Sequence, residues 1–330
     1  MAKKIFHTVH AAVHGISDKD YDVTTTELGR GGFGVVYLGS YEGQKVAVKR
    51  VRSANHISSI KAEVDALLAC PSPYLVRLVA IANHDSAAPT LLFEHMDGGS
   101  LRSFLDKNRL HQRTSARVTN LHVAWVVANA LKDLHLRKMA HRDIKSENVL
   151  LSSSDEIKLG DLGLARIVAT EMTEAPGTRY WMAPEILRAN GTSYGLAADI
   201  YAFGVLLTEL ATGQLPYFDQ DVQDPIAFNR GVIDGSLRPT LPTECEGWLR
   251  TLTDMCLRGD PKARPTVDQI VEILQNEVAA APTAGTDAPT MFLRAVASDN
   301  VDVVVPLLRD GLSHGTALPV SSPTTDVHQT

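Results

Sequence analysis

Hydrophobic residues recur at two spacings along this chain, and the change of spacing separates the elements that we expect. Residues 35–38 and 46–49 are short, valine-rich runs bounded by glycine or polar residues, which is typical of β-strands. Across residues 60–68 the apolar positions recur every three or four residues, so this segment predicts a helix with one buried face. Two longer apolar stretches, 123–131 and 200–210, are interrupted by polar residues and predict buried helices rather than membrane spans.

A glycine-rich segment lies between two expected strands near the start of the chain. Gly29, Gly31 and Gly34 separate the strand 21–28 from the next one. Glycine lets backbone N–H groups approach phosphates closely, because it has no side chain to block them. Dinucleotide-binding proteins use the same glycine spacing, and a plain hairpin turn is a further alternative. Here a strand rather than a helix follows, and the strand after it ends at Lys49, which favours an ATP site.

The strongest chemical signal lies in the middle of the chain. Residues 141–148 read His-Arg-Asp-Ile-Lys-Ser-Glu-Asn, and Asp-Leu-Gly follows at 161–163. Asp143 can orient a hydroxyl group, and Asn148 and Asp161 offer the hard oxygen donors that suit Mg²⁺. Phosphoryl transfer from ATP needs such groups at about this separation. The alternative for Asp143 and Asn148 is a loop cap without chemistry.

Taken in order, these motifs resemble those of the eukaryotic protein kinases over about residues 22–278. The resemblance implies an α+β, bilobal fold with a small N-terminal lobe of antiparallel sheet plus one helix, and a large, mostly helical C-terminal lobe. It also implies a buried ion pair between Lys49 and the small-lobe helix. The register favours Glu63 as the partner over Asp65, which lies about 200° around the helix. A second, structural ion pair is implied between Glu185 and Arg264.

The resemblance also assigns roles to individual residues. Asp143 would accept the proton of the substrate hydroxyl, and Lys145 would steady the γ-phosphate. Glu94 and Met96 would offer backbone hydrogen bonds to adenine. The expected catalytic residues are Asp143, Lys145, Lys49 and Glu63. The expected ATP contacts are Leu28, Gly29, Gly31, Gly34, Val36, Ala47, Lys49, Glu94, Met96, Leu150 and Asp161. The expected Mg²⁺ ligands are Asn148 and Asp161.

Two details bear on the type of kinase. Residues 181–185 read Trp-Met-Ala-Pro-Glu, which is similar to tyrosine kinases, whereas Lys145 follows the serine/threonine pattern. Together they resemble the tyrosine-kinase-like group of serine/threonine kinases, which implies transfer of the ATP γ-phosphate to protein serine or threonine in intracellular signalling. A tyrosine or dual-specificity kinase is one alternative. A pseudokinase scaffold is another, but it predicts the loss of a catalytic residue and all of them are present. Leu162 stands where phenylalanine is commoner in the family, and Asp161 is retained.

Composition excludes some classes of protein. The 330 residues are 44% hydrophobic, which suffices for one large two-lobed domain. The net charge of −6 shows no basic footprint for a nucleic acid. The three cysteines, Cys70, Cys245 and Cys256, form no C-x-x-C pair and fit a reducing compartment. No run of 18 apolar residues exists, so we expect a cytoplasmic protein without a membrane span.

The N-terminal extension, residues 1–21, contains three histidines at helical spacing. His7, His10 and His14 predict the solvated face of a short helix, and a metal site is the alternative.

The C-terminal region is expected to lie outside the catalytic domain. Residues 279–289 read as a linker, and 315–330 read as a disordered tail. Between them, residues 290–314 are similar to one ankyrin repeat. Because one repeat cannot bury its own apolar face, this segment is expected to pack on the kinase domain or to belong to a longer array. It is also a candidate surface for a protein partner.

Overall fold

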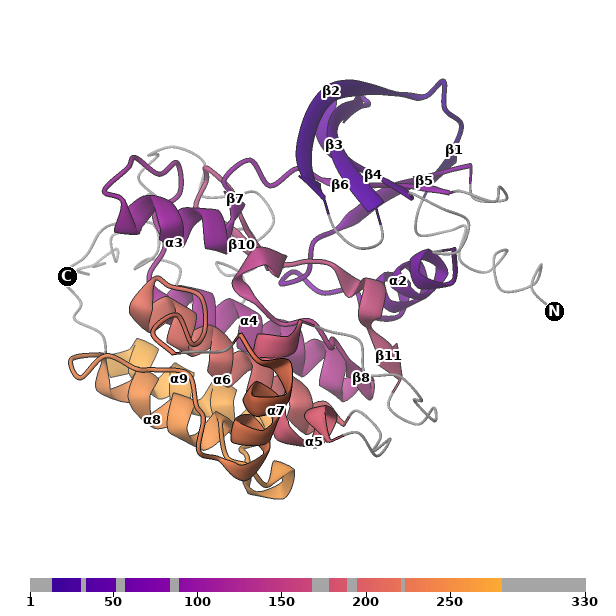
Figure 1. The fold of residues 1–330 in the computed structure, drawn as a ribbon. Coiled ribbons are helices and arrows are strands. Elements are labelled where there is room, and N and C mark those ends of the chain that lie inside the picture. The colour runs from indigo at the N-terminus through magenta and orange to yellow at the C-terminus, as the bar shows by residue number, and fades with distance from the viewer. Residues whose placement is uncertain are drawn as a thin grey trace, which may run out of the picture.

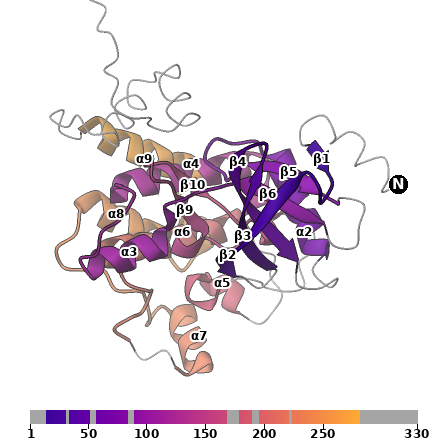
Figure 2. The ribbon, with the colours of Figure 1, turned by 90° about the horizontal axis from the view of Figure 1, so that it is seen from above.

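The computed structural model describes residues 14–30, 34–51, 57–83, 89–167, 178–188, 195–220 and 223–280. These residues form two lobes, a small one built on a sheet and a large one built on helices (Figure 1). A view from above separates the strands of the small lobe from the helices of the large lobe (Figure 2). This arrangement confirms the predicted α+β, bilobal fold.

The small lobe is a six-stranded sheet in the order β1-β5-β6-β4-β3-β2, with one helix beside it. All its strand pairs are antiparallel except β1 with β5, which is parallel. In chain order the elements of this lobe are β1 (His14–Ile16), β2 (Tyr21–Arg30), β3 (Gly34–Tyr41), β4 (Gln44–Val51), α2 (Ile57–Ala69), β5 (Leu78–Ala82) and β6 (Thr90–Glu94).

Successive side chains of β4 lie on opposite faces of the sheet. Val46 and Val48 are buried in a cluster with Tyr21 and Leu92 of the same sheet. Because successive side chains of a strand point to opposite faces, Ala47 and Lys49 lie on the other face. Lys49 reaches the large lobe from there, so this face is turned toward the junction of the lobes.

The large lobe contains most of the helices. Its elements are β7 (Gly99–Ser100), α3 (Leu101–Arg109), α4 (Asn120–Leu136), β8 (Met139–Ala140), η2 (Ser146–Asn148), β9 (Val149–Leu151), β10 (Ile157–Leu159), η3 (Leu162–Leu164), β11 (Arg166–Ile167), η4 (Arg179–Trp181), α5 (Pro184–Leu187), α6 (Leu196–Thr212), α7 (Pro225–Asp234), α8 (Gly247–Cys256), η5 (Pro261–Ala263) and α9 (Val267–Ala280).

Helix α6 is the centre of this lobe. Every residue from 198 to 210 is buried, and the helix packs against α4 and α8. Gly204 makes the packing on α8 close, because a Cβ at this position would lie 2.7 Å from the Cβ of Cys256. The helices predicted at 60–68, 123–131 and 200–210 are confirmed as parts of α2, α4 and α6.

The ends of the chain bring one correction. His14 was expected on a short helix, but it begins strand β1, which pairs with β5. Pairing with a distant strand outweighed the local helical spacing of the histidines. Several predicted features lie outside the described residues. They are His7, His10, residues 281–289 of the linker, the ankyrin-like segment and the tail. In the described part of the chain, no helix is both long and apolar enough to cross a membrane.

Candidate active site

Lys49 connects the two lobes. Its ammonium group donates to both carboxylate oxygens of Glu63 on α2, each at 2.8 Å. It also donates to Oδ1 of Asp161, just before η3 in the large lobe, at 3.0 Å. Asp65, the alternative partner, is exposed on the other side of α2. The ion pair with Glu63 is therefore the one that forms.

The charges of this cluster are coupled. Burial disfavours the ammonium group of Lys49, but the carboxylates of Glu63 and Asp161 outweigh it and raise its pKa. Burial likewise opposes ionisation of Asp161, yet Lys49 lowers the pKa of this carboxyl below its usual value. Burial raises the pKa of Glu63, but two contacts of 2.8 Å with the ammonium group indicate an ion pair, so we treat both partners as charged.

The residues expected to contact a nucleotide come from both lobes. Apolar side chains of Leu28, Val36, Ala47 and Leu150 keep part of their surface exposed, so they can pack against a ring. A Cβ added at Gly29 would meet no atom within 4 Å, so the space above this backbone is open to a phosphate. Gly34 begins β3 and is buried, whereas Gly31 lies outside the described residues.

The connection between the lobes passes from β6 to β7. The carboxylate of Glu94 turns away from the nucleotide side and accepts from Lys158 of β10, at 2.7 and 2.8 Å. Its backbone N–H donates to the carbonyl of Arg77 at 3.1 Å, so the backbone carbonyl is the group left for the role expected of Glu94. Met96 follows two residues later and is buried.

Asp143 lies in a compact cluster with two other polar side chains. Lys145 donates to Oδ2 of Asp143 and to the hydroxyl of Thr178, both at 2.7 Å. Thr178 in turn donates to Oδ1 of Asp143 at 3.1 Å. Thr178 was not among the predicted catalytic, ATP-binding or metal-binding residues. Its place in the Gly-Thr pair at 177–178, shortly before the 181–185 motif, indicates from sequence that it lies next to the substrate site.

Asn148 is joined to Asp143 through its amide nitrogen. That nitrogen donates to the backbone carbonyl of Asp143 at 2.7 Å and to its carboxylate at 2.9 Å. The amide oxygen is thus the atom that Asn148 can offer to a cation. Within the described residues no group of three or more His, Cys, Asp or Glu side chains gathers as a metal site. A carboxylate and an amide oxygen suit Mg²⁺, which usually completes its shell with water and substrate phosphates.

Two residues of the site hold a left-handed backbone conformation. Arg142 has φ of 75° and Asp161 has φ of 58°, which is uncommon for residues other than glycine. Asp199 of α6 supports the first of them, because its carboxylate accepts from the backbone N–H groups of His141 and Arg142, at 2.8 and 2.9 Å. Burial opposes ionisation of Asp199, but the hydrogen bond from His135 and nearby charges lower its pKa.

The second predicted ion pair is also present. Arg264 donates to both oxygens of Glu185 at 2.7 Å, in a bidentate arrangement, and its guanidinium group lies 5.0 Å from the centre of the Tyr201 ring. This pair joins the segment after η4 to the end of the lobe. Arg264 also donates to the backbone carbonyl of Ala197 at 2.7 Å, which fits the structural role expected of this pair.

Residues 23–274 of the chain match the family model of the protein kinase domain. Similar curated proteins include a Dictyostelium discoideum protein named as a probable serine/threonine-protein kinase, which is 35% identical over 264 residues. That alignment covers 77% of this chain and 27% of the relative.

Two vertebrate relatives are named as mitogen-activated protein kinase kinase kinases. Mitogen-activated protein kinase kinase kinase 13-B from Xenopus laevis is 33% identical over 270 residues, and the alignment covers 80% of this chain and 26% of the relative. Mitogen-activated protein kinase kinase kinase 12 from Rattus norvegicus is 32% identical over 270 residues, and the alignment covers 80% of this chain and 28% of the relative. The aligned part of the chain thus spans about a quarter of the length of these proteins.

Proposed function

This chain belongs to the protein kinase family, and we propose that it transfers the γ-phosphate of ATP to serine or threonine hydroxyl groups of proteins. The observation that carries the proposal is the chain of contacts from Glu63 through Lys49 to Asp161. These contacts join Lys49, which would bind the phosphates, to Asp161, which would bind the metal, across the junction of the lobes. Phosphoryl transfer depends mainly on such positioning and on charge stabilisation.

In this mechanism the cluster around Asp143 handles the acceptor. Asp143 orients the hydroxyl group and accepts its proton as the new P–O bond forms and the bond from the γ-phosphorus to the β,γ-bridging oxygen breaks, leaving ADP. Lys145 lies 2.7 Å from Asp143 and neutralises charge on the transferred phosphoryl group. Lys49 holds the α- and β-phosphates, and Glu63 keeps the ammonium group in place.

Asn148 and Asp161 are the residues that would hold Mg²⁺. Their donor atoms fit this ion, because both are hard oxygens and the Asn148 amide nitrogen is already engaged with Asp143. A bound Mg²⁺ would supply charge neutralisation on the phosphates. Leu28, Gly29, Gly31, Gly34, Val36, Ala47, Met96 and Leu150 complete the ATP site in this proposal, together with the backbone of Glu94.

Serine or threonine is favoured as the acceptor for two reasons. Lys145 contacts both Asp143 and Thr178, and a lysine at this position follows the serine/threonine pattern. One relative is named as a probable serine/threonine-protein kinase, and others are named as mitogen-activated protein kinase kinase kinases. We therefore assign the chain to the tyrosine-kinase-like group. Tyrosine or dual specificity is the second candidate, favoured by the Trp-Met-Ala-Pro-Glu sequence at 181–185.

A pseudokinase scaffold is the non-enzymatic alternative. It is disfavoured because Lys49, Asp143, Asn148 and Asp161 are all retained, and the first, second and fourth of these take part in the ion pairs described above.

Fewer observations bear on the cellular location of the enzyme and on its protein partners. All three cysteines are free, which supports a cytoplasmic location. The ankyrin-like segment at 290–314 remains a candidate contact for a protein partner, on the sequence pattern alone. Binding of a partner to the full chain but not to a chain truncated at Ala280 would test it.

The decisive test is a phosphotransfer assay on mixed peptides with phosphoamino-acid analysis of the product. Asp143→Asn should lower the rate by at least about 100-fold, because a positioned base contributes this much. Binding of Mg·ADP, measured by calorimetry, should be retained. Asp254→Asn, on the exposed face of α8, is the matched control and should behave as wild type. Near wild-type transfer by Asp143→Asn, or phosphotyrosine as the main product, would contradict the proposal.

A further inference from the structure

A groove of about 520 Å³ opens on the large lobe, between the end of α3 and the segment that follows α6. Its walls include Arg109 of α3, Tyr180 of η4, and Leu215 and Phe218 of the segment after α6. A volume of this size is typical of sites that bind ligands. None of these residues belongs to the ATP or Mg²⁺ site proposed above.

One wall of the groove belongs to the segment that meets the catalytic cluster. Tyr180 comes two residues after Thr178, whose hydroxyl donates to Asp143 at 3.1 Å. Because consecutive Cα atoms are about 3.8 Å apart, the backbone of Tyr180 lies within about 8 Å of Thr178. An extended peptide advances about 3.3 Å per residue, so about two or three residues cover this span. A peptide whose hydroxyl group lies at Asp143 can therefore place a neighbouring side chain in the groove.

The segment after α6 is fixed at both ends. At its start, the backbone carbonyl of Gly213 accepts from the guanidinium of Arg102 on α3 at 2.5 Å. At its end, the side-chain amide of Gln220 donates to the backbone carbonyl of Arg238 at 2.8 Å and to the hydroxyl of Thr240 at 3.0 Å. A wall that is already ordered loses little entropy when a ligand binds, which favours affinity.

The same segment turns one side chain inward and two outward. Tyr217 has a left-handed backbone, with φ of 61°, and its buried ring lies 5.0 Å from the ring of Phe228, between centroids. It also lies 6.2 Å from the ring of Tyr180, so it joins the two walls of the groove. Leu215 and Phe218 keep 47% and 48% of their surface exposed. A ligand that covers this apolar surface gains binding free energy from removing it from water.

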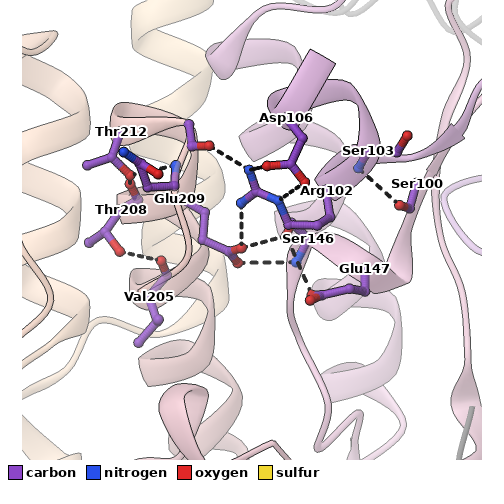
Figure 3. Close-up of polar contacts among 12 residues, drawn as sticks. Ser100, Arg102, Ser103, Asp106, Ser146, Glu147, Val205, Thr208, Glu209 and Thr212 are labelled. Atoms are coloured by element: carbon purple, nitrogen blue, oxygen red, sulfur yellow. Dashed lines mark hydrogen bonds and ion pairs between the residues drawn. The ribbon is translucent and has the colours of Figure 1, made fainter. Parts of the chain in front are cut away.

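The charged side chains of the groove are already matched. Asp106 accepts from Arg102 at 2.9 and 3.1 Å, and a nitrogen of Arg109 lies 3.7 Å from its Oδ1. Figure 3 shows Arg102 between Asp106 and Glu209 of α6, whose carboxylate lies 3.4 Å from the guanidinium. Since two arginines already face Asp106, this carboxylate offers little attraction to a lysine or arginine of a peptide. The groove is therefore suited to an apolar side chain.

We propose that this groove selects the acceptor peptide, by taking a large apolar side chain that lies a few residues from the phosphorylated serine or threonine. Leu215 and Phe218 contact that side chain and determine the specificity. This inference rests on the proposed function and narrows it. The substrates are proteins whose phosphorylation site carries leucine, methionine or phenylalanine at one nearby position, rather than basic residues.

The test begins with a library of peptides that have a fixed serine and one varied residue at each nearby position. Two peptides, with leucine or alanine at the selected position, are then compared in the wild type and in the double variant Leu215→Ser with Phe218→Ser. Both side chains are exposed, so the variant should fold. Leu136→Ser, at an exposed leucine that ends α4, is the matched control.

The wild type should favour the leucine peptide in kcat/KM by about tenfold or more, since methylene groups in an apolar site have effects of this size. In the double variant this ratio should fall to within about twofold, through loss of rate on the leucine peptide alone. The KM for Mg·ATP and the rate on the alanine peptide should stay unchanged. The control should keep the wild-type ratio. Because each ratio is taken within one protein, a general loss of activity cancels.

The inference is overturned if the library shows no apolar preference, if it selects a charged residue, or if the double variant keeps the wild-type ratio. It is also overturned if sedimentation shows a wild-type dimer that the double variant does not form, because a second copy would then occupy the groove. In each of these outcomes the phosphorylation of serine persists and the proposed function stands. If the wild type phosphorylates no peptide of the library, the proposed function fails and the inference fails with it.

Discussion

Lys49 and Glu209 are both buried charges, but their surroundings compensate them differently. Lys49 faces two carboxylates within 3.0 Å, so its charge is matched by charge. Glu209 is held mainly by neutral donors, because the guanidinium of Arg102 is 3.4 Å away and is shared with Asp106. Burial raises the pKa of Glu209 to about 7, whereas Lys49 stays charged at any working pH. Of these two residues, Glu209 is the one whose charge changes near neutrality.

We predict opposite effects of pH on activity and on stability through Glu209. The charged groups facing it are Arg102 and Asp106 from α3 and Glu147 from η2. The donors of Ser146, Arg102 and Trp181 need the ionised carboxylate, and Ser146 comes three residues after Asp143. We therefore expect kcat to rise as the pH increases from about 6 to 8. Glu209→Gln should lack this rise. A kcat profile that is the same in both proteins would contradict the prediction.

The stability effect has the other sign. A carboxyl whose pKa is raised from 4.5 to about 7 by folding binds its proton more tightly in the folded state. Its contribution to the free energy of unfolding is thus complete below pH 4.5 and is lost as the pH rises through about 7. The loss is on the order of 3 kcal/mol. Urea unfolding of wild type and Glu209→Gln at pH 5 and pH 8 measures it, and Glu209→Gln should lose less.

Residues of the site differ in how far a sequence can reveal them. Lys49, Asp143, Asn148 and Asp161 were predictable because phosphoryl transfer needs their groups at recurring spacings. Glu209 was visible only as a charge within the apolar stretch 200–210. Its partners Trp181 and Ser146 lie 28 and 63 residues away, and nothing local indicates them.

At the scale of elements, the close packing of α6 on α8 depends on Gly204. A Cβ at this position would lie 2.7 Å from Cβ of Cys256 and 3.0 Å from a methyl group of Leu257. The first atom is fixed by the backbone of α8, so it cannot move without shifting the helix.

We therefore expect Gly204→Ala to lower the free energy of unfolding by about 1–3 kcal/mol, as overpacking of a core does. Gly247→Ala is the control, because Gly247 lies at the start of α8 and an added Cβ would meet no atom within 4 Å. It should be neutral or slightly stabilising, by less than about 1 kcal/mol. Chemical denaturation of both variants measures the difference. Equal stability of the two would show that the helices can separate freely.

Element prediction succeeded where the pattern was local and failed where pairing was distant. The buried helices α4 and α6 were evident from apolar stretches that no strand would fill. Strand β1 was not, because three residues carry little pattern and its partner, β5, begins 62 residues after its last residue, Ile16. The close approach at Gly204 was also invisible, since it depends on which helix packs there.

At the scale of the whole molecule, ion pairs link the lobes at the nucleotide site, in addition to the apolar core that joins Ala66 of α2 to the large lobe. Lys49 and Asp161 provide one link, and Glu94 and Lys158 provide another beside the connecting segment. A ligand that contacts both lobes should therefore stabilise the folded state. We expect Mg·ADP at 100 times its Kd to add about 2.7 kcal/mol to the free energy of unfolding.

Thermal unfolding with and without Mg·ADP measures this effect. Asp161→Asn should lose the part of the shift that depends on Mg²⁺, so that its curves with ADP in Mg²⁺ and in EDTA coincide. Asp254→Asn should keep the full shift. A Mg²⁺-dependent shift of normal size in Asp161→Asn would show that this carboxylate does not hold the metal.

The catalytic unit should not require the C-terminal segment. Every residue assigned to chemistry precedes residue 200, and the last buried residue of α9 is Val278, two residues before the helix ends. We predict that a chain truncated after Ala280 folds, with a melting temperature within a few degrees of the full chain, and phosphorylates a generic peptide at a similar kcat. A chain truncated after Thr266 is the contrasting case, because it lacks α9 and exposes the face of α4 against which α9 packs. It should not fold stably. If the chain ending at Ala280 is folded but inactive, residues 281–330 support the kinase domain directly, and the ankyrin-like segment would be part of the enzyme rather than an independent contact surface.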